Sequence, residues 1–131
     1  MAKLLVEKGL APTYLLSSPA NRAYSTARLF ADELGIAEND IALDKSLYES
    51  FTHEILSAVG TLPEHHDCAA IFSHNPGLTS AVSQYAEQYV SNVPTCGIGV
   101  VELDGTWQQM SKPQGTLAHL LFPKHVLSAY A

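Results

Sequence analysis

The segment Ala69–Leu78, AAIFSHNPGL, decides how this chain folds. Its apolar first half predicts a buried strand, and the apolar spacing after Gly77 predicts a helix. Asn75 is a good helix N-cap, and Pro76 suits the first helical position because an N–H there would have no intrahelical partner. His74 is therefore expected where a strand ends and a helix begins. In open α/β sheets ligands bind at such strand ends, and a helix N-terminus favours an anion.

A second strand and helix precede this segment and repeat its order. Thr13–Ser17 is a short apolar run that predicts a strand, and Ser18 with Pro19 predicts a capping residue followed by the first helical residue. The helix is expected to run to about Leu34 and to end at Gly35. Its apolar residues share one face: Ala23, Ala27, Phe30 and Leu34.

The remaining pattern alternates between helices and extended segments. The expected elements are a helix end in Met1–Leu10, an extended segment Ile41–Tyr48, a helix capped by Thr52 that runs through Val59, a helix from Pro76 to about Val90, strands Gly97–Leu103, Thr106–Met110 and Thr116–Phe122, a hairpin turn at Asp104 and Gly105, and a terminal helix Pro123–Tyr130. Strands that alternate with helices before a hairpin indicate an α/β fold, with a mostly parallel sheet that has an antiparallel part. No repeat or interdomain linker interrupts residues 1–131, so one domain is expected.

Composition excludes several classes of protein. The chain has 131 residues, of which 7 are basic and 13 acidic, so neither a nucleic-acid surface nor an anionic membrane face is expected. No apolar run approaches the roughly 20 residues of a membrane-spanning helix, and no signal-peptide pattern is present. Cys68 and Cys96 lack the spacing of a metal or redox site, so two reduced, buried thiols in a cytoplasmic protein without a cofactor are expected.

Two further groups of polar residues have a structural interpretation. His65, His66 and Asp67 lie together in the polar loop before the central strand. Adjacent histidines point in different directions and no third ligand is spaced to join them, so a solvated loop is expected and no metal. No nucleophile-elbow pattern surrounds Ser17 and Ser18, which are expected to serve as turn and cap.

Arg22 lies in the first turn of the helix that follows Ser18 and Pro19, at the same expected sheet edge as His74. An arginine fork and an imidazole aimed at one point, with two helix N-termini behind them, form a phosphate site. Each residue alone also has a structural interpretation, with Arg22 as a solvated side chain and His74 as a hydrogen-bonded residue at a strand end. Their combination favours the phosphate site.

Several motifs in order give the chain a family resemblance. Residues 16–27, LSSPANRAYSTA, resemble the second signature of the histidine phosphatase superfamily, Ser-Ser-Pro-x-x-Arg-Ala-x-x-Thr-Ala. Residues 47–49 and 73–78 are similar to its later blocks, and residues 94–97 to the Pro-Thr-Gly segment of its bacterial phosphohistidine phosphatase branch. The resemblance extends to about Pro123, and it implies the three-layer α/β/α fold of phosphoglycerate mutase-like proteins.

The resemblance implies a two-step phosphoryl transfer, in which a histidine takes the phosphoryl group and water then releases it. It implies that Arg22 and His74 hold the phosphoryl oxygens and stabilise the transition state, with Asn75 beside them in the phosphate site. Glu49 matches a position where some members keep an acid for the leaving group, and a solvated loop carboxylate is the structural alternative. The implied substrate is a protein domain that carries phosphohistidine or a small phosphorylated compound.

The family's first signature, Leu-Val-Arg-His-Gly/Ala, carries the nucleophilic histidine, and no Arg-His pair occurs in these 131 residues. Met1–Leu10 matches only the second half of the family's first helix. In the family, the missing first strand lies between the strand before His74 and the antiparallel strands. Without it, two interior strand edges are expected to be unpaired, which is costly when they are buried. His53 is the one other histidine expected near the site.

Three explanations of the missing first strand stay open. The natural product is longer than this chain, or the chain is truncated and compensates by rearranging or dimerising, or another polypeptide supplies the strand. Two functions are likewise open. The first is a phosphohistidine phosphatase-like hydrolase that is inactive in this form because it lacks the nucleophile. The second is a catalytically dead module that binds phosphate-bearing ligands or a partner, with a homodimer as one state.

Overall fold

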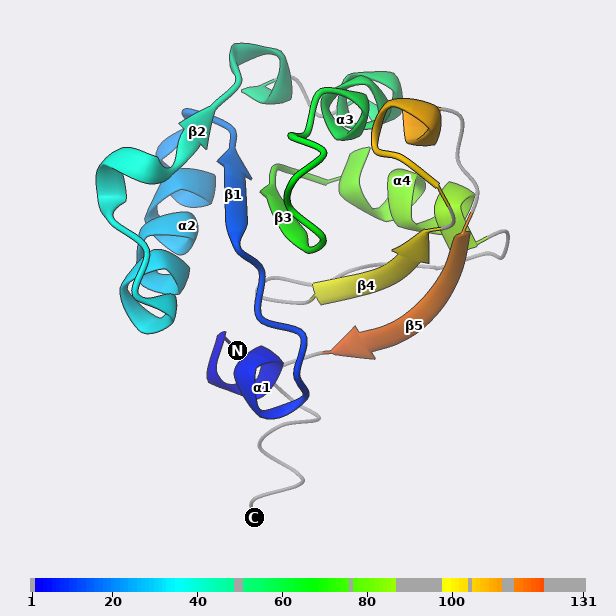
Figure 1. Ribbon diagram of the computed structural model, residues 1–131. Coiled ribbons are helices and arrows are strands. Elements are labelled where there is room, and N and C mark those ends of the chain that lie inside the picture. Colours follow the sequence, from blue (N-terminus) through cyan, green and yellow to red (C-terminus); the bar gives the residue numbers. More distant parts are fainter. Residues whose placement is uncertain are drawn as a thin grey trace.

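At the centre of the computed structural model, β1 (Tyr14–Ser17) lies between β2 (Ala42–Leu43) and β3 (Ala69–Phe72), and the three strands run parallel (Figure 1). The structure describes residues 2–48, 51–75, 77–86, 98–103, 105–111 and 115–121. The other elements are α1 (Ala2–Glu7), α2 (Asn21–Leu34), η1 (Glu38–Asp40), η2 (Lys45–Tyr48), α3 (Thr52–Gly60), α4 (Gly77–Ala86), β4 (Ile98–Leu103), η3 (Gln108–Ser111) and β5 (Gly115–Leu121), where η denotes a 3₁₀ helix.

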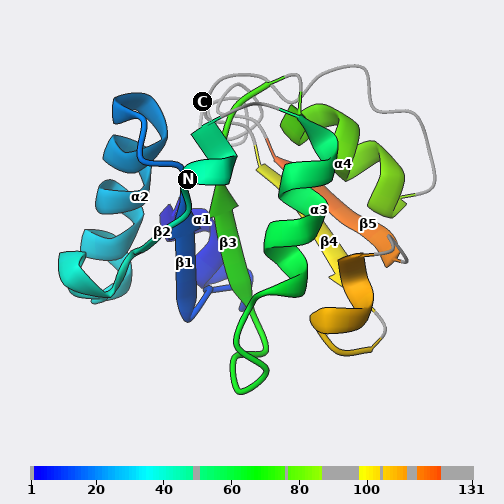
Figure 2. The same cartoon turned by 90° about the horizontal axis from the view of Figure 1, so that it is seen from above.

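β1 separates two hydrophobic cores, because successive side chains of a strand point to opposite faces of its sheet. Leu15 shares a core with α1 and α2, whereas Leu16 shares a core with α3 and α4. Figure 2 shows α2 on one side of β1 and β3, with α3 and α4 on the other. Helices therefore cover both faces of the parallel sheet, as the sequence predicts. The core residues in α-helices are Ala2, Leu5, Ala27, Phe30 and Ala31 on the first face, and Ile55, Ala58, Val59, Ala81 and Tyr85 on the second.

β4 and β5 form a separate antiparallel sheet, and β4 does not pair with β3. β3 therefore has β1 as its one hydrogen-bonded neighbour among the described strands, and its four apolar residues are only half-buried. Ala70 and Phe72 of β3 nevertheless pack against the same core as Ile98 and Val100 of β4. Within the described ranges, β3 and β4 thus each lack a partner on one edge, which agrees with the two unpaired edges expected without the family's first strand.

Two helix ends follow the sequence closely. α2 ends at Gly35, whose φ of 72° is in the left-handed region that glycine enters without a Cβ penalty, and Ile36 N–H donates to the Ala31 carbonyl at 2.8 Å. Before α4, the side-chain oxygen of Asn75 accepts a hydrogen bond from Thr79 N–H at 3.1 Å. The predicted helix stop at Gly35 is confirmed. The Asn75 side chain accepts an N–H of the first turn of α4, but α4 is described only from Gly77, so the N-cap position of Asn75 stays a prediction.

The predicted strand Thr106–Met110 is wrong, because this segment turns into η3 and β4 pairs with β5 instead. Thr106 and Gln109 form a capping box. Gln109 N–H donates to Thr106 Oγ1 at 3.3 Å, and Thr106 N–H donates to Gln109 Oε1 at 2.9 Å. These reciprocal bonds satisfy donors at the start of a helical turn, so the segment folds locally rather than returning along β4.

Other expected boundaries also need correction. α2 begins at Asn21 with Ala20 as its N-cap, so Pro19 is not its first residue and Ser18 is not its cap. The predicted extended segment Ile41–Tyr48 is extended only in β2, since η2 follows it. The N-cap of α3 is Phe51, and Thr52 is already helical.

Some predictions fall outside the described residues: those for Glu49, Pro76, Cys96, residues 94–97 and the helix Pro123–Tyr130. α4 is described up to Ala86, so its expected extension to Val90 lies outside as well. No helix within the described ranges is long and apolar enough to cross a membrane.

Candidate functional site

The register of β1 and β3 brings two loops together at the carboxyl edge of the parallel sheet. Ser17 pairs with Phe72, and the N–H of the next residue, Ser18, donates to the Phe72 carbonyl at 2.8 Å. Just beyond this bond, His74 Nε2 lies 3.0 Å from Ser18 Oγ. The motif loop after β1 and the motif loop after β3 are therefore in direct contact through these two side chains.

Ser18 is held firmly within the loop after β1. It is 0% exposed, and its Oγ accepts a hydrogen bond from Ala20 N–H at 3.2 Å. The hydroxyl of Ser17, equally buried, donates to the Ser18 carbonyl at 2.8 Å. Asp44 N–H donates to the Ser17 carbonyl, so the chain after β2 also braces this point. The sequence predicts Ser18 as a helix cap, whereas the structure makes it the buried contact of His74.

The loop after β3 is built around the start of α4. The His74 carbonyl accepts Leu78 N–H at 3.0 Å, which fixes the backbone next to the half-buried His74 side chain. Asn75 Oδ1 accepts hydrogen bonds from the backbone N–H and from the hydroxyl of Thr79, at 3.1 and 2.7 Å. This oxygen is thus used to cap α4, and the role of Asn75 in phosphate binding stays a prediction.

Arg22 is the second residue of α2, and its side chain is exposed to solvent. Its carbonyl accepts the Thr26 hydroxyl at 3.0 Å, a bond within the helix that leaves the guanidinium uninvolved. The N-cap residue, Ala20, has no polar side chain with which to accept the N–H groups of the first turn. α2 therefore starts at the same sheet edge as the loop of His74, and the convergence of Arg22 with His74 on one ligand stays a prediction.

The segment between β2 and α3 lies beside the loop after β3. Ser73 Oγ donates to the Leu47 carbonyl at 3.1 Å, which ties β3 to η2. Tyr48 and Phe51 expose most of their surface, and the ring of Phe51 stacks on that of His53 with 6.4 Å between centroids. His53 Nε2 lies 2.8 Å from Glu54 Oε1, so the described contacts of this imidazole are local.

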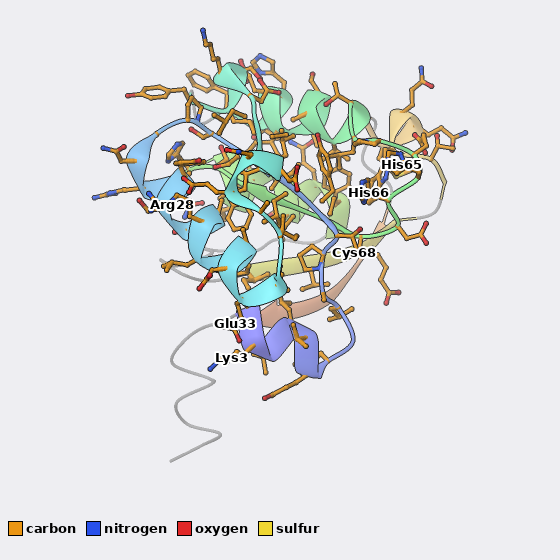
Figure 3. All side chains as sticks on the ribbon, turned by 60° about the vertical axis from the view of Figure 1, so that its left-hand side comes forward. Lys3, Arg28, Glu33, His65, His66 and Cys68 are labelled. Carbon is orange, nitrogen blue, oxygen red and sulfur yellow. The ribbon has the colours of Figure 1, made fainter. Side chains whose placement is uncertain are left out.

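His65, His66 and Cys68 belong to a different region, before the amino end of β3 (Figure 3). His66 Nδ1 lies 2.9 Å from Thr13 Oγ1, and the His66 carbonyl accepts the Trp107 indole N–H at 2.8 Å. These bonds tie the loop to the start of β1 and to the turn before η3. Cys68 is a free, half-buried thiol whose pKa is raised by burial. The contacts of this region are structural, and it lies at the opposite edge of the sheet from His74.

The chain can be compared with known proteins at the level of family, sequence and fold. No protein-family model matches it, and no curated protein matches it. A solved structure of a putative phosphohistidine phosphatase, SixA from Nakamurella multipartitia, aligns with a TM-score of 0.69. The alignment covers 93% of this chain and 77% of that chain at 16% sequence identity. The chain therefore has a mixed α/β fold similar to that of this protein, with a parallel sheet and helices consistent with the phosphoglycerate mutase-like fold.

Proposed function

We propose that this chain belongs to the histidine phosphatase superfamily and forms one half of a site that binds and transfers a phosphoryl group. One observation carries the proposal. The hydrogen-bond contact of 3.0 Å between Ser18 and His74 joins the Ser-Ser-Pro-x-x-Arg loop to the Ser-His-Asn-Pro-Gly loop at one edge of the sheet. The two motifs that the resemblance identifies are distant in sequence and adjacent in space.

In the proposed site, Arg22 and His74 each donate hydrogen bonds to phosphoryl oxygens. A guanidinium presents a planar fork of donors that suits a phosphate, and the charge it neutralises grows in the transition state. The N-termini of α2 and α4, with 14 and 10 residues, add the positive ends of two helix dipoles at the same edge. Asn75 supports the site by capping α4 and, in this proposal, by contacting the anion.

Turnover in the proposed mechanism needs a histidine nucleophile, and these 131 residues contain no Arg-His pair. This chain alone is therefore expected to bind phosphate without hydrolysing a phosphorylated substrate. Glu49 is the proposed acid for alkoxide leaving groups. The imidazole of a phosphohistidine leaves readily without such an acid when its P–N bond breaks, which favours a phosphohistidine-bearing protein as substrate; a small phosphorylated compound is the other proposed substrate.

A second candidate function follows from the same absence of an Arg-His pair. The chain would then be a binding module that recognises a phosphate-bearing ligand and never turns it over, alone or as a homodimer. The codons upstream of Met1 separate the two candidates. An Arg-His motif in frame supports the hydrolase, and a stop codon supports the binding module.

Phosphate binding tests the proposed site directly. Inorganic phosphate is titrated into the chain while amide shifts of the loops after β1 and β3 are followed by NMR. Arg22→Ala is expected to weaken binding at least about tenfold, the usual effect of losing a hydrogen bond to a charged group. Arg28→Ala is the matched control, because Arg28 is exposed on the same helix and pairs with Glu38 at 3.4 Å. Equal binding by wild type and Arg22→Ala would remove the proposed site.

A further inference from the structure

The donor and acceptor sites of the Ser18 hydroxyl can be compared one by one with its contacts. A serine Oγ has one O–H to donate and two lone pairs to accept with. Ala20 N–H donates to it at 3.2 Å, and the other contact of Oγ in the described part of the chain is His74 Nε2 at 3.0 Å. Because Ser18 is 0% exposed, bulk solvent does not reach its hydroxyl to accept a hydrogen bond.

The direction of the bond to His74 follows from this count. A neutral imidazole has one nitrogen that donates and one that accepts. If Nε2 carried the proton, Ser18 Oγ would receive two donors, and its own O–H would be buried without an acceptor in the described part of the chain. Buried donors of that kind are rare, because the lost hydration is not replaced. The arrangement that satisfies every group has Ser18 O–H donating to Nε2.

We infer that Ser18 is a positioning residue that holds neutral His74 in the tautomer with its proton on Nδ1. Ser18 fixes the ring from one side, through a hydroxyl that is itself fixed by Ala20 N–H. Nδ1–H is then a donor that points away from the Ser18 bond. No partner of Nδ1 occurs among the described residues, and in this inference Nδ1–H is the donor that meets a ligand.

This inference deepens the proposed function and rests on it for its catalytic meaning. A neutral Nδ1–H donates a hydrogen bond to a phosphoryl oxygen without needing a second proton on the ring. Ser18 would thus set which nitrogen of His74 meets the anion, although Ser18 itself never touches it. Free histidine in water prefers the Nε2–H tautomer, so the preference for Nδ1–H has to be imposed by the protein.

Long-range ¹H–¹⁵N NMR spectra of the ¹⁵N-labelled chain test the inference, because protonated and unprotonated ring nitrogens differ widely in chemical shift. Spectra are recorded at alkaline pH in phosphate-free buffer, and His74→Gln identifies the His74 signals by their loss. In wild type, Nδ1 is expected at the protonated position and Nε2 at the unprotonated one. An Nε2–H pattern in wild type would overturn the inference, whatever the variants show.

Variants at two neighbouring serines complete the experiment. Ser18→Ala is expected to move His74 toward the Nε2–H tautomer, and Ser18→Thr, which keeps the hydroxyl, is expected to retain Nδ1–H. Ser17→Ala is the matched control, because Ser17 is equally buried but donates to the Ser18 carbonyl and not to His74. An unchanged tautomer in folded Ser18→Ala would overturn the inference. The wild-type spectrum decides the question if Ser18→Ala does not fold.

The test separates the inference from the proposed function. An Nδ1–H tautomer in a chain that does not bind phosphate would leave Ser18 as the positioning residue of His74 and remove the phosphate site. Phosphate binding that depends on Arg22, together with an Nε2–H tautomer, would keep the proposed function and remove the role of Ser18.

Discussion

Ser17 and Phe72 lie opposite each other in the parallel register of β1 and β3, and this pairing places Ser18 next to His74. Because side chains alternate along a strand, a shift of one residue would turn every side chain of β3 to the other face. The register is fixed by the cores, since Leu15 and Leu16 of β1 pack in different clusters on the two faces. The contact that defines the candidate site is thus set by the packing of the sheet.

The absence of a nucleophile predicts that this chain does not form phosphohistidine. Incubation with ³²P-labelled acetyl phosphate or phosphoramidate is expected to leave no acid-labile phosphoprotein, because no histidine directly follows an arginine in these 131 residues, as the proposed mechanism requires. Phosphoamino acid analysis after alkaline hydrolysis, which preserves phosphohistidine, measures the label, and a version extended by the in-frame upstream codons serves as comparison. Label on His53 of the chain itself would show that another histidine replaces the nucleophile.

Asn75 is predicted to combine two roles that substitutions can separate. Asn75→Ala removes the oxygen that accepts Thr79 N–H, and is expected to lower the free energy of unfolding by about 1 kcal/mol. Asn75→Asp keeps an acceptor and adds a negative charge, so it is expected to retain stability. The same charge should repel an anion, so Asn75→Asp should weaken phosphate binding. Urea unfolding and phosphate titration measure the two effects. Loss of stability in Asn75→Asp equal to that in Asn75→Ala would contradict the capping role.

The strands and helices that were predicted correctly are those whose signals are local. The apolar run of β1 and the stop of α2 at Gly35 each depend on a few adjacent residues. The turn at Thr106 also had a local signal, since Thr-x-x-Gln is a capping box, but the Asp-Gly pair before it favoured a hairpin. The two local signals predict different structures for this segment, and the structure has the helical turn.

The contact of Ser18 with His74 could not be predicted from the sequence in the same way. A serine before proline at the end of a strand is typical of a helix cap, and that is its local interpretation. Its actual partner is 56 positions away and becomes a neighbour only through the pairing of β1 with β3. The common sheet edge of the two loops was predictable from strand direction, whereas the side-chain pair required the register.

Gly99 is predicted to be a position where β4 approaches α4 too closely for a larger residue. A Cβ built on Gly99 would lie 2.8 Å from Val82 Cγ2 and 3.0 Å from Val82 Cγ1, closer than carbon atoms pack. Gly99→Ala is therefore expected to lower the free energy of unfolding by about 1–3 kcal/mol. In a Val82→Ala background the same substitution should cost much less, because the methyl groups it meets are gone. A double-mutant cycle by urea unfolding measures this, and equal costs in both backgrounds would disprove the contact.

Tyr85 is predicted to make stability fall at alkaline pH. Its hydroxyl donates to the Met110 carbonyl at 2.6 Å, and burial raises its pKa from 10.0 to about 12. Between these two values the unfolded chain has lost the phenolic proton while the folded chain keeps it. The folded state therefore binds more protons, and stability is complete below pH 10 and falls as the pH rises toward 12.

The expected slope from Tyr85 is of the order of 1.4 kcal/mol per pH unit in that window. Tyr85→Phe should abolish this slope. At pH values below that window it should lower the free energy of unfolding by about 1 kcal/mol, because the buried Met110 carbonyl loses its donor. Urea unfolding at several pH values measures both effects, and the difference from wild type cancels the other titrating groups. Tyr48→Phe is the control, since Tyr48 is 61% exposed and should leave the wild-type profile unchanged. A profile for Tyr85→Phe that runs parallel to that of wild type above pH 10 would show that the buried phenol does not keep its proton in the folded chain.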